Sequence, residues 1–154
     1  MRVFQFKLSH NILYTNNRLY KMKLVESEMC TFCNSTLETP VHLFYDCDVA
    51  SKLRQELVDN NGTKFKVKFE DLSKKRIMFG FIKDWKGPNM MLLNHLLLMF
   101  KRYIYIQKCK NAKPCLSGLM SFISNTKYIK LNIAKQKKIE GMHYKKWSPV
   151  EELF

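Results

Sequence analysis

The stretch that decides the fold runs from Cys30-Thr-Phe-Cys33 to His42-Leu-Phe-Tyr-Asp-Cys47. Its spacing is C-x2-C-x8-H-x4-C, so three thiols and one imidazole fall within eighteen residues. Zinc takes four such ligands in a tetrahedron, and a Cys3His set fills that shell without leaving a position for water. The stretch therefore predicts a structural Zn²⁺ site whose ligands are Cys30, Cys33, His42 and Cys47.

The residues around these ligands predict a tight turn and a short helix. Thr39 and Pro40 are typical of a helix N-cap followed by proline at the first helical position, which places His42 in the first turn. Five residues advance an ideal α-helix by about 140° beyond one full turn. Cys47 therefore cannot share a face with His42 in a regular helix. We expect the helix to end or bend just before Cys47, with Asp48 capping a second helix.

Other interpretations of the cysteines have less support. Chance spacing does not account well for three scarce cysteines at ligand intervals. Nothing in the sequence suggests secretion, which a disulfide would require, and a redox Cys-x-x-Cys pair would follow a strand in a βαβ unit. The two remaining cysteines, Cys109 and Cys115, are interpreted as free thiols in or beside the core.

Three segments, residues 4–22, 29–34 and 38–47, resemble one known family, the zinc-binding domain found C-terminal to the reverse transcriptase of non-LTR retrotransposons. The family pattern has an aromatic-rich opening helix, Thr-Asn before a second helix, Cys-x-x-Cys, a Glu-Thr/Ser-x-x-His-Leu-Phe turn and a final Cys. The resemblance covers roughly Phe4 to Leu57. Weaker motifs, Ile104 through Pro114 and Lys-Lys-Trp-Ser-Pro149, look like the C-terminal tail of the same polyproteins.

Two departures from the family pattern stand out, and neither removes a ligand. Lys23 stands where the family often has the glycine that ends the second helix, and Asp48 stands where proline often follows the last cysteine. The resemblance implies a module of a larger polyprotein, and we expect this chain to be a fragment of one.

No catalytic site is predicted. Tyr45-Asp46-Cys47-Asp48 is only superficially similar to the Tyr-x-Asp-Asp turn of polymerases, because Cys47 is assigned to zinc. Some relatives carry a nuclease after the zinc motif, but residues 85–154 contain only three acidic residues, Glu140, Glu151 and Glu152. We therefore predict that the chain is not an enzyme.

Composition points to a globular chain that binds polyanions. Hydrophobic residues make up 46% of the 154 residues, and the formal net charge is +14. Residues 1–47 hold five Lys/Arg and four Asp/Glu, whereas residues 48–154 hold the other 22 and 9. Such a basic region favours nucleic acid as a partner. The alternative is a solvated, lysine-rich surface without a specific partner.

The periodicity predicts a mainly α fold, with the zinc knuckle embedded in a helical domain and at most one short strand. Apolar spacing indicates helices over Val3–Leu13, from Thr15 or Asn16 to about Lys23, Asp48–Asp59 and Glu70–Phe79. Phe4, Leu8 and Ile12 form the first stripe, and Val3, Phe6 and Leu13 widen it. Asn60-Asn-Gly62 is expected to end the third helix, and Phe65, Val67 and Phe69 alternate with lysines as in a short strand.

The second half is predicted to contain a buried central helix from Met90 to about Lys108, too interrupted by polar residues to span a membrane. Pro114 begins the last helical region, which either bends near Asn125 or leaves the core with a lysine face exposed. The expected division is 1–62 for the zinc-binding domain, 63–89 for an extended linker and 90–154 for a basic helical region. No secretory or membrane signal is visible, so we expect an intracellular protein of nucleus or cytoplasm.

The basic tail is the candidate nucleic-acid surface. Its predicted phosphate contacts are Lys127, Lys130, Lys135, Lys137, Lys138, Lys145 and Lys146. Lysines neutralise phosphates without reading bases, so RNA or DNA would bind with little sequence preference. Tyr128, Tyr144 and Trp147 could stack on bases or pack in the protein, and Phe32 could stack on a base or cover the metal.

Two functions follow from the sequence. The first is a zinc-binding module that contacts template RNA or target DNA. The second is a structural module in which zinc only stabilises the fold and the apolar helix docks on the upstream reverse transcriptase or another protein.

Overall fold

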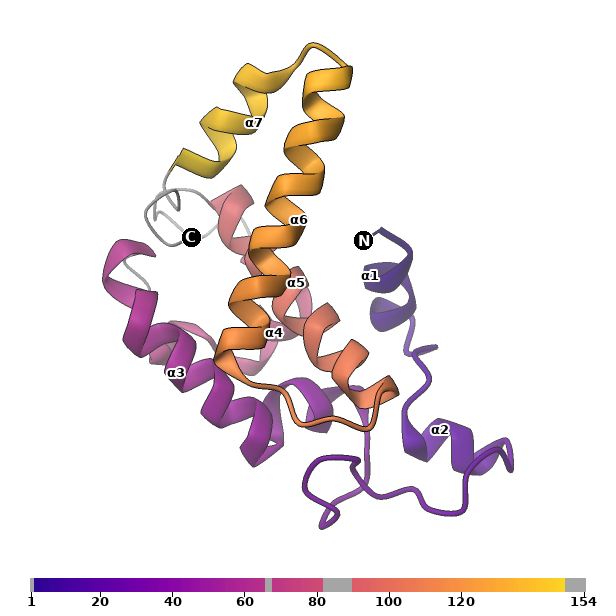
Figure 1. Cartoon of the computed structure of the whole chain (residues 1–154). Helices are drawn as coiled ribbons and strands as arrows, with labels where there is room; N and C mark the ends of the chain where they lie inside the picture. The colour runs from indigo at the N-terminus through magenta and orange to yellow at the C-terminus, as the bar shows by residue number, and fades with distance from the viewer. Residues whose placement is uncertain (1, 66–67, 82–89, 149–154) are drawn as a thin grey trace.

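The computed structural model describes residues 2–65, 68–81 and 90–148, and it is mainly helical (Figure 1). Within these ranges the one pairing of extended backbone is an isolated antiparallel bridge between Met29 and Leu37. The predicted fold class is therefore confirmed. The elements in chain order are α1 (Arg2–Ser9), α2 (Asn16–Lys21), the π-helix η1 (His42–Asp46), α3 (Asp48–Phe65), the 3-10 helix η2 (Phe69–Asp71), α4 (Lys74–Phe79), α5 (Met90–Cys109), α6 (Leu116–Gln136) and α7 (Glu140–Trp147).

Helix α5 is the central element, as its apolar sequence predicted. Its buried side chains include Leu92, Met99 and Ile104, and η1 and α6 pack against it. Even the cation Lys101 is buried, and its ammonium donates hydrogen bonds to the Met78 carbonyl and the Gln5 side chain. Among the described residues, no helix combines the length and the apolar character that a bilayer crossing requires.

The first two helices end earlier than predicted, each two residues before a residue with left-handed backbone. Helix α1 stops at Ser9, because Asn11 has a left-handed backbone with φ 52° and the Ile12 amide donates a hydrogen bond to the Lys7 carbonyl. Phe4 is buried as expected, but Phe6 is 57% exposed and does not widen the stripe. Lys23 follows α2 with φ 58°, which explains why glycine suits this position.

Helix α3 is longer than predicted, and the described ends of the expected strand, Phe65 and Phe69, are helical. The helix continues through Asn60-Asn-Gly62 to Phe65, with the Asn60 side chain donating to the Glu56 carbonyl. Phe65 is thus helical and Phe69 begins η2, while residues 66–67 lie outside the described residues. The helix predicted from Glu70 is divided at Ser73, whose hydroxyl caps α4.

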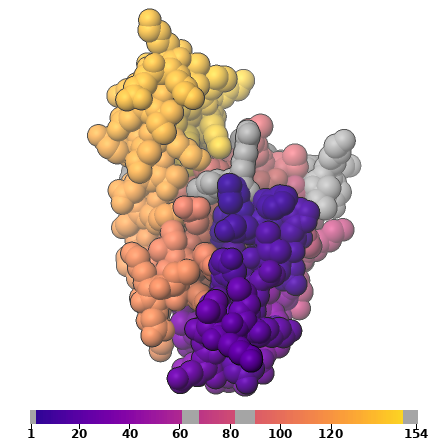
Figure 2. All heavy atoms as spheres, turned by 90° about the vertical axis from the view of Figure 1, so that its right-hand side faces the viewer, coloured from indigo at the N-terminus to yellow at the C-terminus, as the bar shows by residue number. Residues whose placement is uncertain are grey.

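The last two helices form a hairpin that projects from the body of the molecule (Figures 1 and 2). Helix α6 continues past Asn125 without interruption, so its second half leaves the core, and α7 folds back beside it. This α6–α7 hairpin comprises residues 116–147. Trp147 at its end is 1% exposed and belongs to the same cluster of buried residues as Phe4 in α1. The division at residues 62 and 90 stays a prediction.

Candidate metal centre

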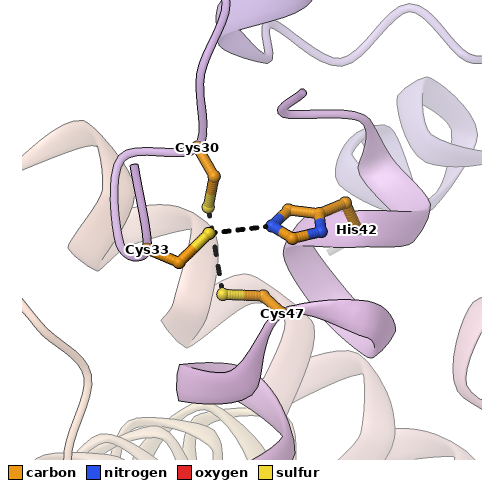
Figure 3. Close-up of side chains that lie close together, drawn as sticks. All are labelled: Cys30, Cys33, His42 and Cys47. Carbon is orange, nitrogen blue, oxygen red and sulfur yellow. Dashed lines mark hydrogen bonds between the residues drawn. The ribbon is translucent and has the colours of Figure 1, made fainter. Parts of the chain in front are cut away.

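The four predicted ligands converge on one point (Figure 3). One donor atom from each of Cys30, Cys33, His42 and Cys47 lies within 4.8 Å of all the others. The sulfurs of Cys30 and Cys47 are 3.9 Å apart, and the Cys33 sulfur is 3.3 Å from His42 Nε2. Zinc bond lengths imply tetrahedral edges of about 3.8 Å between sulfurs and about 3.5 Å between sulfur and nitrogen. The donor set therefore fits a tetrahedral metal ion.

The first two ligands come from a closed loop. The bridge between Met29 and Leu37 forms its base, and the Cys30 amide donates to the Thr36 carbonyl at 2.8 Å. Inside the loop the backbone amide of Asn34 donates a hydrogen bond to the Cys30 carbonyl, and Asn34 has a left-handed backbone with φ 51°. This tight turn points both thiols at the same place.

The other two ligands are separated by a π turn, which resolves the geometric conflict in the sequence. Thr39 caps the segment as predicted, since its hydroxyl accepts from the His42 amide at 3.1 Å. The Cys47 amide then donates to the His42 carbonyl at 2.8 Å, a hydrogen bond that spans five residues instead of four. The wider turn returns Cys47 to the side of His42. Cys47 itself is extended, and α3 begins at Asp48.

Three of the four ligands are buried and Cys33 is half-buried, and contacts among them shift the pKa values of the thiols. The side-chain contact with Cys47 raises the pKa of Cys30, and the same contact lowers the pKa of Cys47. Burial raises the pKa of Cys33, but hydrogen bonds from Ser35 and His42 outweigh it and leave the pKa below its ordinary value. Thiolates are the metal-binding form, so ion binding would release the remaining thiol protons.

Phe32, inside the Cys-x-x-Cys turn, is 6% exposed and belongs to the buried cluster. It therefore cannot stack on a base while it stays packed. The interpretation of Phe32 as a packing residue beside the centre agrees with this burial.

Sequence reasoning missed Glu38, a fully buried carboxylate next to the centre. One carboxylate oxygen of Glu38 accepts a hydrogen bond from the backbone amide of Asn16 at 2.7 Å. The other oxygen accepts hydrogen bonds from the backbone amide and the hydroxyl of Thr31 at 2.8 and 2.7 Å. Glu38 thus ties the start of α2 to the Cys-x-x-Cys turn. A hint was available in the sequence, because Glu38 lies in the same short segment as the helix cap and His42.

Glu38 also joins the metal centre to the second half of the chain. Lys108 in α5 is 8% exposed, and its ammonium lies 3.5 Å from the Glu38 carboxylate and 3.2 Å from the Tyr14 carbonyl. A buried ion pair of this kind needs further hydrogen bonds to offset the desolvation of both charges. Glu38 has three such bonds, so the pair fixes α5 against the knuckle.

The structure separates the seven predicted phosphate-binding lysines into two groups. The side chains of Lys135, Lys137, Lys138 and Lys145 are exposed on the α6–α7 hairpin, whereas Lys127, Lys130 and Lys146 are partly buried. The Lys130 ammonium donates to His95 Nε2 in α5 at 2.6 Å. Burial lowers the pKa of Lys130 to about 8. Lys130 therefore anchors the hairpin and is a poor phosphate contact.

The three aromatic residues proposed for stacking also differ. Tyr128 and Tyr144 are 65% and 47% exposed on the hairpin. Trp147 is buried, with the His95 ring meeting it edge-on at 5.6 Å between centroids. Packing is thus the role of Trp147, and only the two tyrosines are accessible to a base.

Comparison with known proteins identifies the N-terminal segment. Residues 1–53 match the model of a family described as zinc-binding in reverse transcriptase, and the match includes all four ligands. The comparison finds this domain and no catalytic domain. No curated protein and no solved structure matches the chain.

Proposed function

Because residues 1–53 are a zinc-binding domain of the reverse-transcriptase type, we propose that the chain is a nucleic-acid-binding module shaped by a structural Zn²⁺. The observation that carries the metal part is the convergence of Cys30, Cys33, His42 and Cys47 within 4.8 Å. Four protein ligands complete the tetrahedral shell, so the ion would supply cross-linking and no catalytic water.

The nucleic-acid part rests on charge and exposure. Residues 48–154 carry 22 of the 27 Lys/Arg, and the α6–α7 hairpin carries exposed lysines together with exposed Tyr128 and Tyr144. Lysines bind phosphates and aromatic rings stack on bases irrespective of sequence. We therefore propose sequence-tolerant binding of single-stranded RNA or DNA, such as template RNA or target DNA during reverse transcription.

A salt titration tests this proposal. A variant with Lys135, Lys137 and Lys138 changed to Gln is compared with one in which exposed Lys52, Lys75 and Lys110 are changed to Gln. Both lose three charges, but only the first loses them from the hairpin. Each lost phosphate contact lowers the slope of log affinity against log salt by about 0.7 for single strands. We expect a slope reduced by about 2 in the hairpin variant and by less in the control. Equal slopes in the two variants would contradict the assignment.

A specific observation also favours the second function, a protein-interaction module. The hairpin exposes several large apolar side chains, namely Tyr128, Ile129, Ile133 and Met142. Most apolar side chains of helix α5 are already covered within the chain, although Met91 is 75% exposed, so α5 offers less apolar surface for docking than the sequence suggested. On this alternative, the hairpin docks on a polymerase or another protein. No oligonucleotide binding at low salt would favour it over the first proposal.

A further inference from the structure

A cavity of about 210 Å³ lies between α2 and the cap of η1. It is lined by residues before and within α2 and by Thr39 and Pro40. Thr39 is also the residue whose hydroxyl accepts from the His42 amide, so the cavity shares a wall with the metal centre. Pockets for drug-sized ligands begin at about 300 Å³, so this cavity suits a smaller group.

The cavity wall combines apolar Leu13 and Pro40 with basic and polar residues. Arg18 and Lys21 are its charged residues, and no acidic side chain lines it. Neither cation forms an ion pair with any residue in the described ranges. The Arg18 guanidinium is held in place by a hydrogen bond from Nη1 to the Asn11 carbonyl at 2.9 Å. The cavity therefore favours an anionic group.

Two polar atoms of the lining residues have hydrogen-bonding capacity that the fold does not use. Asn17 Oδ1 and Arg18 Nε are buried, and neither has a partner among the described residues. A buried polar atom without a partner costs about 1–3 kcal/mol. Both atoms belong to residues that line the cavity, so a ligand there is the candidate partner for them.

The pairing of cations with an amide indicates which anion fits. A carboxylate only accepts hydrogen bonds, so it would match Arg18 but not Asn17 Oδ1. A sugar hydroxyl both donates and accepts, and so it matches the amide in either orientation. A phosphate attached to a sugar meets both requirements.

We propose that this cavity binds one sugar–phosphate unit of a single-stranded nucleic acid, with the phosphate on Arg18 and Lys21 and a sugar hydroxyl on Asn17. The strand would then run past the metal centre as well as over the α6–α7 hairpin. This inference rests on the proposed function, and it adds a second contact on the nearly neutral N-terminal region.

The test uses NMR of the zinc-loaded full chain labelled with ¹⁵N. Ribose 5-phosphate, inorganic phosphate and neutral ribose are titrated separately while the amides of Asn17 and Arg18 and the Arg18 Nε–H are followed. We expect saturable shifts with ribose 5-phosphate, weaker binding of inorganic phosphate and none of ribose. No saturable shift at these groups would overturn the proposal.

Three variants locate the binding. Lys21→Gln should raise the Kd for ribose 5-phosphate by about fivefold, a loss of about 1 kcal/mol, while Lys23→Gln should leave it within about twofold. Lys23 is the matched control, because it is exposed and does not line the cavity. Asn17→Ala should weaken ribose 5-phosphate by about threefold and inorganic phosphate hardly at all. Equal effects of Lys21→Gln and Lys23→Gln would overturn the proposal.

A short single-stranded oligonucleotide separates this inference from the proposed function. An oligonucleotide that binds and shifts the cavity resonances in a Lys21-dependent manner supports both. An oligonucleotide that binds without shifting them overturns the cavity assignment and leaves the proposed function. Saturable binding of ribose 5-phosphate without any oligonucleotide binding overturns the proposed function and, with it, the assignment of the cavity to a nucleic-acid strand.

Discussion

The metal-centred region (residues 2–47) and the α6–α7 hairpin (residues 116–147) are held together by different kinds of interaction. In the first, α1, α2 and η1 have eight, six and five residues, too short to be stable alone. Their positions depend on four converging ligands and on the buried Glu38. In the hairpin, α6 alone has 21 residues, and the anchors are Trp147 and the Lys130–His95 hydrogen bond.

The two parts of the chain also differ in net charge. The metal-centred region buries Thr15, Glu38 and His42 and carries a balance of +1 over residues 1–47, whereas residues 48–154 carry +13. A region held by a few polar atoms loses its structure when one of them is removed. A long helix with an exposed surface can lose surface charges and keep its structure. Each prediction below tests this contrast, from the largest expected effect to the smallest.

Removing the metal should have the largest effect. Structural zinc in such sites contributes about 10–16 kcal/mol of apparent binding free energy, comparable with folding itself. We expect chelator, Cys33→Ser or His42→Ala to unfold residues 2–47 while α5 and the α6–α7 hairpin keep much of their helicity. Zinc content and residue-specific hydrogen exchange measure this. Cys109→Ser is the control, because Cys109 is an exposed free thiol. A chelator-insensitive N-terminal region would refute the prediction.

Glu38→Gln should have the next largest effect. The substitution keeps the shape but leaves Lys108 as a buried charge without its partner, which typically costs about 3–5 kcal/mol. Urea unfolding of the zinc-loaded protein measures the loss, with exposed Glu26→Gln as the control. The double variant Glu38→Gln, Lys108→Met should recover part of the stability. A double variant as unstable as the single one would show that the charge of Lys108 is not the cause.

Trp147→Ala should destabilise the α6–α7 hairpin and leave the metal-centred region intact. Truncating a buried tryptophan costs about 3–5 kcal/mol, and we expect the loss to free α7 while the metal stays bound. Hydrogen exchange of α7 amides and zinc content together measure this separation. Tyr144→Ala, at a 47% exposed site on the same helix, is the matched control. Loss of zinc in Trp147→Ala would mean that the two regions unfold as one.

Lys101 should make stability depend on alkaline pH. Burial lowers its pKa from 10.5 to about 8, so between these values the unfolded chain binds more protons and stability rises with pH. The penalty for the buried charge is fully present below pH 8 and disappears as pH approaches 10.5, a change of up to about 3 kcal/mol. The stability of the wild type relative to Lys101→Met should rise over this range in zinc-loaded protein. If the stability of the wild type and of Lys101→Met changes equally with pH, Lys101 is excluded as the source of the pH dependence.

Lys23→Gly should give a small gain in the metal-centred region. Lys23 has φ 58°, a conformation that costs an L-residue about 1–2 kcal/mol and costs glycine almost nothing. Part of the gain is lost to the greater freedom of glycine in the unfolded chain, so we expect about 1 kcal/mol in urea unfolding. Lys21→Gly, within α2, should instead destabilise.

The metal centre was predictable because its evidence is local. The spacing from Cys30 to Cys47 and the Thr39 cap are read within eighteen residues. The length of α3 was not predictable, because Asn60-Asn-Gly62 is a common helix end, whereas here the backbone stays helical to Phe65. The role of Lys130 was missed because its partner His95 lies 35 residues away in another helix.

The sequence by itself determined which four side chains form a group that could hold a metal, that α5 is the buried helix and that the positive charge lies in the second half. These properties depend on residue type and on spacing along the chain. Only the tertiary structure decided that a π turn brings Cys47 back to His42, that Glu38 bonds to α2 and α5, and which lysines face solvent. Those outcomes depend on distances between segments far apart in the chain, and no local pattern specifies such distances.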